Sequence, residues 1–90
     1  MSGNLHDTQF FNALQENNKM KVNQVLQLVY EAMTEKGYNP VNKIVGYVMS
    51  GDPTYITSFN GARSLIVRVE RDEILDELIQ FYIEQKGLNR

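Results

Sequence analysis

The stretch Gly37–Pro53, GYNPVNKIVGYVMSGDP, holds both prolines of the chain and three of its six glycines. Gly37 can end a preceding helix, because glycine adopts the left-handed backbone conformation at low cost. Asn39-Pro40 then supplies a favoured N-cap residue and a proline suited to the first helical turn. Ser50-Gly51 ends this second helix, and Asp52-Pro53 repeats the cap-and-proline start. These two stop-and-start signals predict three successive helical segments joined by short connections.

Helical periodicity extends to the N-terminal side of this stretch. Lys19–Lys36 has apolar residues at the spacing of one buried helical face, with Asn17 or Asn18 available as the cap. Pro40–Met49 is also predicted as a helix, because both its ends carry caps, although its β-branched residues suit a strand as well. The inward side chains expected are Val22, Val25, Leu26, Val29 and Met33 in the first helix, widened by Leu28 and Tyr30, and Val41, Ile44, Val45 and Val48 in the second.

The C-terminal third of the chain continues the helical pattern. Residues 53–58 are predicted to form one helical or 3₁₀ turn, and Asn60-Gly61 marks a turn. Helical spacing returns from Ala62. The apolar stripe shifts phase near Val69, which favours two helices with a break near Arg71 over one long helix, and Asp72 can cap the second. Their apolar residues are Leu65, Ile66 and Val69, then Ile74, Leu75, Leu78, Ile79, Phe81, Tyr82 and Ile83. The last helix is apolar over more than half its girth, which is typical of a helix that contacts its own core and a partner.

Length and composition place the chain among small all-α domains. Ninety residues can bury only a marginal core, and dimerisation is a common remedy at this size. The absence of cysteine excludes disulfides and thiolate metal sites and fits a reducing compartment. A net charge of −2 argues against a general nucleic-acid binder. Neither a signal peptide nor a run long enough to span a bilayer is visible, so a cytoplasmic protein without membrane insertion is expected.

Two domains of different character are expected: a mobile N-terminal arm over residues 1–18, and a helical domain over residues 19–90. The arm is mainly polar, and its one apolar cluster is Phe10, Phe11 and Leu14. His6, the only histidine, lies in this arm, away from any rigid set of ligands or partner groups. We therefore expect no catalytic residue, metal site or cofactor.

Thr8 lies in the arm sequence HDTQFF, beside an acidic residue and ahead of two aromatic ones. Phosphorylation there would add nearly two negative charges, able to draw the arm onto an arginine patch. On chemistry alone, however, most threonines in such a segment are simply solvated.

The charged residues of the helical domain form two groups. The carboxylates of the last helix, Asp72, Glu73, Asp76, Glu77 and Glu84, are interpreted as a solvated face, because no glycine-containing loop of oxygen ligands accompanies them. Arg63, Arg68 and Arg71 are the one basic concentration. They can form a patch that binds an acidic or phosphorylated partner, or they can pair with carboxylates of the same chain, and the sequence leaves these alternatives equal.

The phrase GYNPVNKIVGYVMSGDPTYI, followed by ARSLI and ERDEILDELIQFYI, resembles the IreB/ReoM family of small regulatory phosphoproteins of Gram-positive bacteria. The match covers most of the chain, roughly Val29 to Ile83. The resemblance implies an all-α homodimer of about five short helices with a flexible N-terminal arm and no enzymatic activity. It also implies that a membrane-anchored serine/threonine kinase with PASTA domains phosphorylates a threonine of the arm, which aligns with Thr8.

In such a family, the protein controls peptidoglycan synthesis through Clp-protease turnover of a cell-wall precursor enzyme, and phosphorylation relieves that effect. Arg63 and Arg71 match two arginines that matter for the family's function, and Arg68 lies beside them. The chain departs from the family where Ser58 and Val67 replace further arginines, which thins the basic patch, and where Leu5 stands near an additional threonine of some members.

The sequence therefore predicts a cytoplasmic regulatory phosphoprotein, dimeric and switched at Thr8, whose arginine surface meets a protein partner. Two other interpretations fit the sequence less well. A small helical DNA-binding dimer would place the short helices around Gly51 in a helix-turn-helix, but the acidic charge balance opposes it. A structural dimer without a regulatory arm would tolerate deletion of residues 1–16.

Overall fold

The computed structural model describes residues 21–89, and these residues are helical with no strand among them. Four α-helices and two 3₁₀ segments follow in the order α2 (Val22–Glu35), α3 (Pro40–Ser50), η1 (Pro53–Tyr55), η2 (Phe59–Gly61), α4 (Ala62–Ile66) and α5 (Arg71–Lys86). The predicted all-α class is confirmed, whereas the described part of the chain contains four α-helices instead of about five. The predicted arm, residues 1–18, lies outside the described residues.

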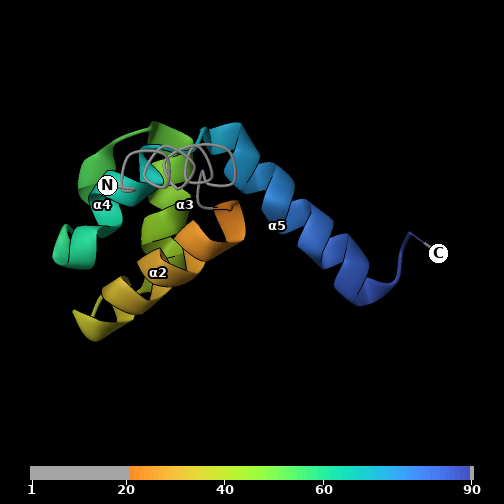
Figure 1. The fold of residues 1–90 in the computed structure, drawn as a ribbon, viewed down its shortest axis with the longest axis horizontal. Helices are drawn as coiled ribbons and strands as arrows, with labels where there is room; N and C mark the ends of the chain where they lie inside the picture. The colour runs from red at the N-terminus through yellow and green to blue at the C-terminus, as the bar shows by residue number, and fades with distance from the viewer. Residues whose placement is uncertain (1–20, 90) are drawn as a thin grey trace, which may run out of the picture.

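Helix α2 is the element around which the others pack. It contacts α3, α4, α5 and η2, and Figure 1 shows α2, α3 and α4 gathered at one end of the fold while α5 runs away from them. The predicted buried face of α2 is confirmed, with Val25, Val29 and Met33 buried together with Ala32. The nine residues that form the buried core are Val25, Val29, Ala32, Met33, Tyr47, Ile56, Ala62, Ile66 and Ile74.

The start and the outer side of α2 differ from the prediction. The helix begins at Val22 and not at Lys19, because Lys21 has an extended backbone (φ −54°, ψ 147°). Its N–H donates to the Gln24 side chain at 3.2 Å, which gives this helix end a cap other than the expected Asn17 or Asn18. Leu28 and Tyr30, expected to widen the buried face, are exposed.

The two stop-and-start signals of the central stretch are confirmed. Gly37 has a φ of 84°, and its N–H donates to the Thr34 carbonyl while the Tyr38 N–H donates to the Met33 carbonyl, which is a Schellman ending. The Asn39 side chain accepts from the Asn42 N–H at 3.0 Å, with Pro40 at the first helical position. The second signal uses different bonds: Gly51, at a φ of 76°, donates its N–H to the Tyr47 carbonyl at 2.7 Å, and the Asp52 N–H donates to the Ser50 hydroxyl at 3.0 Å.

The inner face of α3 was only partly predicted. Ile44 and Val48 pack against the core, but Val41 is 69% exposed and Val45 is 54% exposed, so their predicted inward placement is wrong. Tyr47 is buried in their place. Helix α3 carries two overlapping apolar stripes, and packing against α2 and η1 selects the one that contains Tyr47.

The predicted break near Arg71 is confirmed, but its cap is different. The chain enters α5 at Glu70, whose N–H donates to the Glu73 side chain at 2.9 Å, so Asp72 lies inside the first turn and is not the cap. Of the apolar residues of α5, Ile74 alone is buried. Its exposed apolar residues are Leu75, Leu78, Ile79, Phe81 and Tyr82.

Candidate partner-binding site

Arg63 lies in the short helix α4 and is half-buried. Its Nε donates to the main-chain carbonyl of Ile56 at 2.8 Å, and its own N–H donates to the Thr57 carbonyl at 3.0 Å. Asn60 and Gly61, both at positive φ, turn the chain so that α4 begins beside the segment it contacts. Arg63 therefore fastens α4 to the segment that follows η1.

Arg71 is the first residue of α5, and it reaches back to the end of α3. Its Nη1 donates to the Val48 carbonyl at 2.9 Å. The guanidinium lies so close to Gly51 that a Cβ built there would be 2.9 Å from Arg71 Cζ. The carbonyls of a last helical turn lack helical partners, and a cation beside them is favourable. Arg71 thus completes the C-terminal end of α3.

The structure brings Arg63 and Arg71 to the same segment, residues 48–56, from two different helices. Within residues 21–89, the hydrogen bonds of both guanidinium groups go to main-chain carbonyls and not to Glu70 or Asp72. Arg68 lies in the turn between α4 and α5 and is exposed. The three arginines therefore do not form one uniform patch.

Asp52 lies in that same segment and caps η1. Its Oδ1 accepts from the Thr54 N–H at 3.0 Å and from the Thr54 hydroxyl at 2.7 Å. These two bonds, the main-chain one first, hold the pKa of Asp52 below its usual value, and attraction to Arg63 lowers it slightly further. The carboxylate is thus used locally, as the sequence predicted for a cap.

Three aromatic rings near the junction of α2 and α3 each carry a lysine ammonium above them. Lys36 Nζ lies 5.1 Å from the centroid of the Phe59 ring. Lys43 Nζ lies 5.6 Å from the Tyr38 ring and 5.9 Å from the Tyr55 ring. Sequence reasoning missed this group, because Tyr38 lies in a stretch interpreted through its caps and Tyr55 in a segment interpreted only as a helical or 3₁₀ turn.

The Tyr55 ring lies against Gly46 of α3. A Cβ at Gly46 would overlap the Tyr55 ring, so the absence of a side chain at this position lets the ring lie directly on the helix backbone. A glycine inside a helix costs stability, and here it allows a close contact between α3 and η1.

The model of the IreB regulatory phosphoprotein family matches residues 6–84 of the chain. The chain is also 59% identical over 80 residues to a UPF0297 protein of Lachnoclostridium phytofermentans, a match that covers 89% of this chain and 90% of that relative. The chain belongs to the IreB family. This membership confirms the resemblance inferred from the motifs, and the matched range contains Thr8 together with all three arginines.

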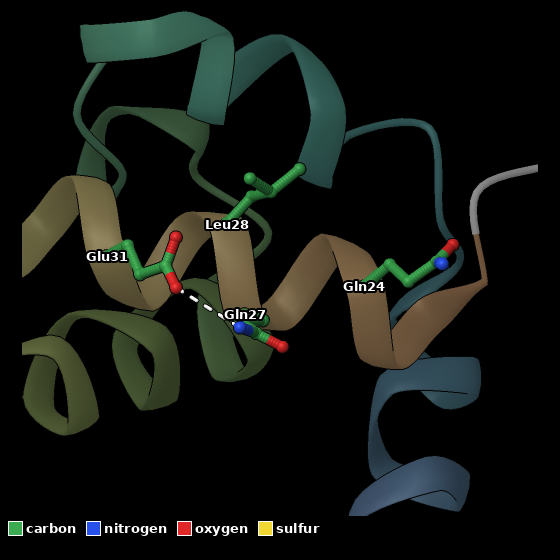
Figure 2. Close-up of a pocket in the computed structure, with 4 residues that line it drawn as sticks. All are labelled: Gln24, Gln27, Leu28 and Glu31. Atoms are coloured by element: carbon green, nitrogen blue, oxygen red, sulfur yellow. Dashed lines mark hydrogen bonds between the residues drawn. The ribbon is translucent and has the colours of Figure 1, made fainter.

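One surface depression of the described part of this IreB-family chain is lined by none of the three arginines. It has a volume of about 300 Å³ and is lined by Gln24, Gln27, Leu28 and Glu31. Figure 2 shows that all four side chains come from α2, with the Gln27 amide donating to the Glu31 carboxylate at 3.1 Å. A depression formed by one exposed helix face lacks the convergent walls of a small-molecule pocket.

Other predicted features of the IreB-family chain fall partly outside the structure. Thr8 and His6 precede the described residues. Between residues 21 and 89, no group of three or more His, Cys, Asp or Glu side chains is placed to hold a metal ion. No helix in the same range is long and apolar enough to cross a membrane. The candidate site is the segment 48–56 together with Arg63 and Arg71, which donate hydrogen bonds to its carbonyls.

Proposed function

We propose that this chain is a cytoplasmic regulatory phosphoprotein that is phosphorylated on Thr8 by a PASTA-domain serine/threonine kinase. It contacts a protein of the Clp-protease pathway and thereby controls the turnover of a cell-wall precursor enzyme. Through this turnover it controls peptidoglycan synthesis. The observation that supports this proposal is the match to a family of regulatory phosphoproteins, which begins at residue 6 and so includes the HDTQFF segment.

The partner-binding surface in this proposal is centred on Arg63 and Arg71, with Arg68 nearby. Each of the first two uses one nitrogen to hold the segment 48–56, and a guanidinium has further N–H donors that can face a carboxylate of a partner. Phosphorylation of Thr8 introduces a competing anion on the same chain, which changes the contact with the partner.

The proposed active form is a homodimer. Large apolar side chains exposed among residues 21–89 outnumber the nine buried ones, and five of them lie on α5, which extends away from α2–α4. A small chain with so much exposed apolar surface gains stability when a second copy covers part of it.

The first experiment is incubation of the purified chain with the kinase domain of a PASTA-type kinase and ATP, followed by mapping of phosphate by mass spectrometry. We expect one phosphate, on Thr8, while Thr34 on the exposed side of α2 remains unmodified as an internal control. Absence of phosphate from Thr8 would contradict the proposed kinase role. Thr8→Ala and Thr8→Glu variants should then differ in binding to the partner and in cell-wall phenotype; equal behaviour would contradict the switch.

A further inference from the structure

The two lysines and three rings form two groups that meet along the chain on either side of Gly37, and together they are here called the Lys–aromatic face (Lys36, Tyr38, Lys43, Tyr55 and Phe59). Lys36 and Tyr38 flank the helix-ending Gly37, and Lys43 joins the Tyr38 ring to the Tyr55 ring. Tyr38 is 47% exposed and Tyr55 is 38% exposed, so both rings are available to a ligand. Exposed tyrosines of this kind are common anchors in protein contacts.

The charge of the surrounding segment favours an anionic ligand. Residues 36–69 contain four basic side chains, Lys36, Lys43, Arg63 and Arg68, and one acidic side chain, Asp52. Asp52 already accepts two hydrogen bonds from Thr54. Five of the eleven acidic residues of the chain lie in α5, namely Asp72, Glu73, Asp76, Glu77 and Glu84, and Glu35 directly precedes Lys36.

We propose that the Lys–aromatic face is the docking site of the phosphorylated N-terminal segment of this chain. The Thr8 phosphate pairs with the ammonium groups of Lys36 and Lys43, and Phe10 and Phe11 pack on the rings. This inference rests on the proposed function, because it requires phosphate on Thr8. It assigns to two lysines an anion contact that the sequence offered to the arginines as one of two alternatives.

The chemistry of the cations supports this assignment. Arg63 Nε and Arg71 Nη1 already donate to main-chain carbonyls, so turning either guanidinium toward a phosphate would disturb a hydrogen bond that holds the fold together. Each lysine ammonium has three donors and lies over a ring face, and Lys36 is exposed while Lys43 is half-buried. Two such ammonium groups suit a phosphate that carries nearly two charges.

The length of the N-terminal segment permits this docking. Thr8 precedes Lys21 by 13 residues, and an extended chain of that length spans roughly 40 Å. Lys36 lies at the opposite end of α2 from Lys21, about 22 Å away along the helix axis. The phosphate can therefore reach the face within one chain. Since Ile56, the contact of Arg63, directly follows Tyr55, the docked segment would cover the neighbourhood of Arg63 and exclude a partner.

The test compares full-length chains that carry genetically encoded phosphothreonine or threonine at position 8, so that its result does not depend on any kinase. Amide and side-chain resonances are recorded by NMR. We expect phosphorylation to shift the signals of Tyr38, Lys43 and Tyr55. The Lys36→Gln/Lys43→Gln variant should lose these shifts. The control variant Lys86→Gln should retain them, because Lys86 Nζ also lies over a ring, 6.0 Å from the centroid of Tyr82, but on α5 and not on the Lys–aromatic face.

The outcomes separate the two proposals. Absence of shifts at the face, shifts confined to Arg63, Arg68 and Arg71, or shifts that persist in the double lysine variant would each overturn the docking site. The failure of a PASTA-type kinase to modify Thr8 would overturn the proposed function while leaving this NMR result valid for the encoded phosphate. The second pKa of the phosphate, near 6 in a free segment, should fall on docking, because nearby ammonium groups favour the dianion; ³¹P NMR measures it.

Discussion

Arg71 Nη1 donates a hydrogen bond to the main-chain carbonyl of Val48 at 2.9 Å, which joins the first residue of α5 to the last turn of α3. The guanidinium also lies against the left-handed Gly51 that ends α3. Arg71, for which the sequence left a partner contact and pairing within the chain equally open, therefore has a structural role.

Substitution of Arg71 should lower stability. We expect Arg71→Ala to reduce the free energy of unfolding by about 1 kcal/mol, because an exposed charged hydrogen bond and a helix-end contact are lost. Arg68→Ala, in the exposed α4–α5 turn, should change it by less than about 0.5 kcal/mol. Urea denaturation measures both. Equal losses in the two variants would contradict the structural role of Arg71, and any loss of partner binding in Arg71→Ala must be compared with this change in stability.

Substitution of Gly51, with Gly37 as the control, tests the contact between Gly51 and the Arg71 guanidinium. Both have positive φ, at 76° and 84°, so substitution by alanine costs each about 1 kcal/mol in backbone strain. A Cβ at position 51 also meets the Arg71 guanidinium, whereas a Cβ at position 37 meets nothing within 4 Å. Gly51→Ala should therefore be the more destabilising change by thermal unfolding. In an Arg71→Ala background the difference should disappear, and its persistence would contradict this explanation.

Gly46→Ala should lower the free energy of unfolding in the native chain and raise it in a Tyr55→Ala background. In the native chain, Gly46→Ala displaces the Tyr55 ring, and we expect a loss of about 1 kcal/mol despite the gain in helix propensity. In a Tyr55→Ala background the clash is absent, so the same change should stabilise the chain by roughly 0.5–1 kcal/mol. A double-mutant cycle followed by urea unfolding measures the coupling. Stabilisation in both backgrounds would show that the ring does not rest on the glycine.

Asp52 should contribute stability that depends on pH. Its folded-state pKa is lowered from 3.8, chiefly by the Thr54 N–H and then by the Thr54 hydroxyl. A carboxylate with a lowered pKa stabilises the fold above its unfolded pKa, and this contribution is lost as the pH falls through the folded value. The stability difference between the native chain and Asp52→Asn should thus shrink below pH 3.8.

Thr54→Val provides the control for Asp52. It removes the hydroxyl donor but keeps the main-chain one, so the pKa of Asp52, followed by NMR titration of its side chain, should return only part of the way to 3.8. A full return would show that the main-chain bond has no effect.

The apolar side of α5 should mediate self-association. We expect Leu78→Glu and Ile79→Glu to weaken the proposed homodimer at least about tenfold, because each change places a charge on an exposed apolar surface that a second copy would cover. Gln80→Glu, on the same helix and also exposed, adds the same charge and should leave association unchanged. Light scattering across a range of concentrations reports the mass. A monomeric native chain would contradict the dimer, and loss of dimer in all three variants would indicate a general charge effect.

The sequence alone determined the helices and where most of them end. Gly37, Asn39, Gly51 and Asp52 act on main-chain groups within a few residues of themselves, so their capping roles could be predicted without knowledge of any neighbour. The break before α5 was visible from the phase shift of the apolar stripe, although its cap is Glu70 and not Asp72.

Only the tertiary structure decided which apolar stripe of α3 is buried and what the arginines and lysines contact. Val41 and Val45 are as apolar as the stripe that contains Tyr47, and the choice between the two stripes depends on α2 and η1, which the spacing within α3 does not record. The contact of Arg71 with Val48 and that of Lys43 with Tyr55 join residues 23 and 12 positions apart. Such contacts depend on the angles between helices, and those angles follow from packing of the whole core around α2.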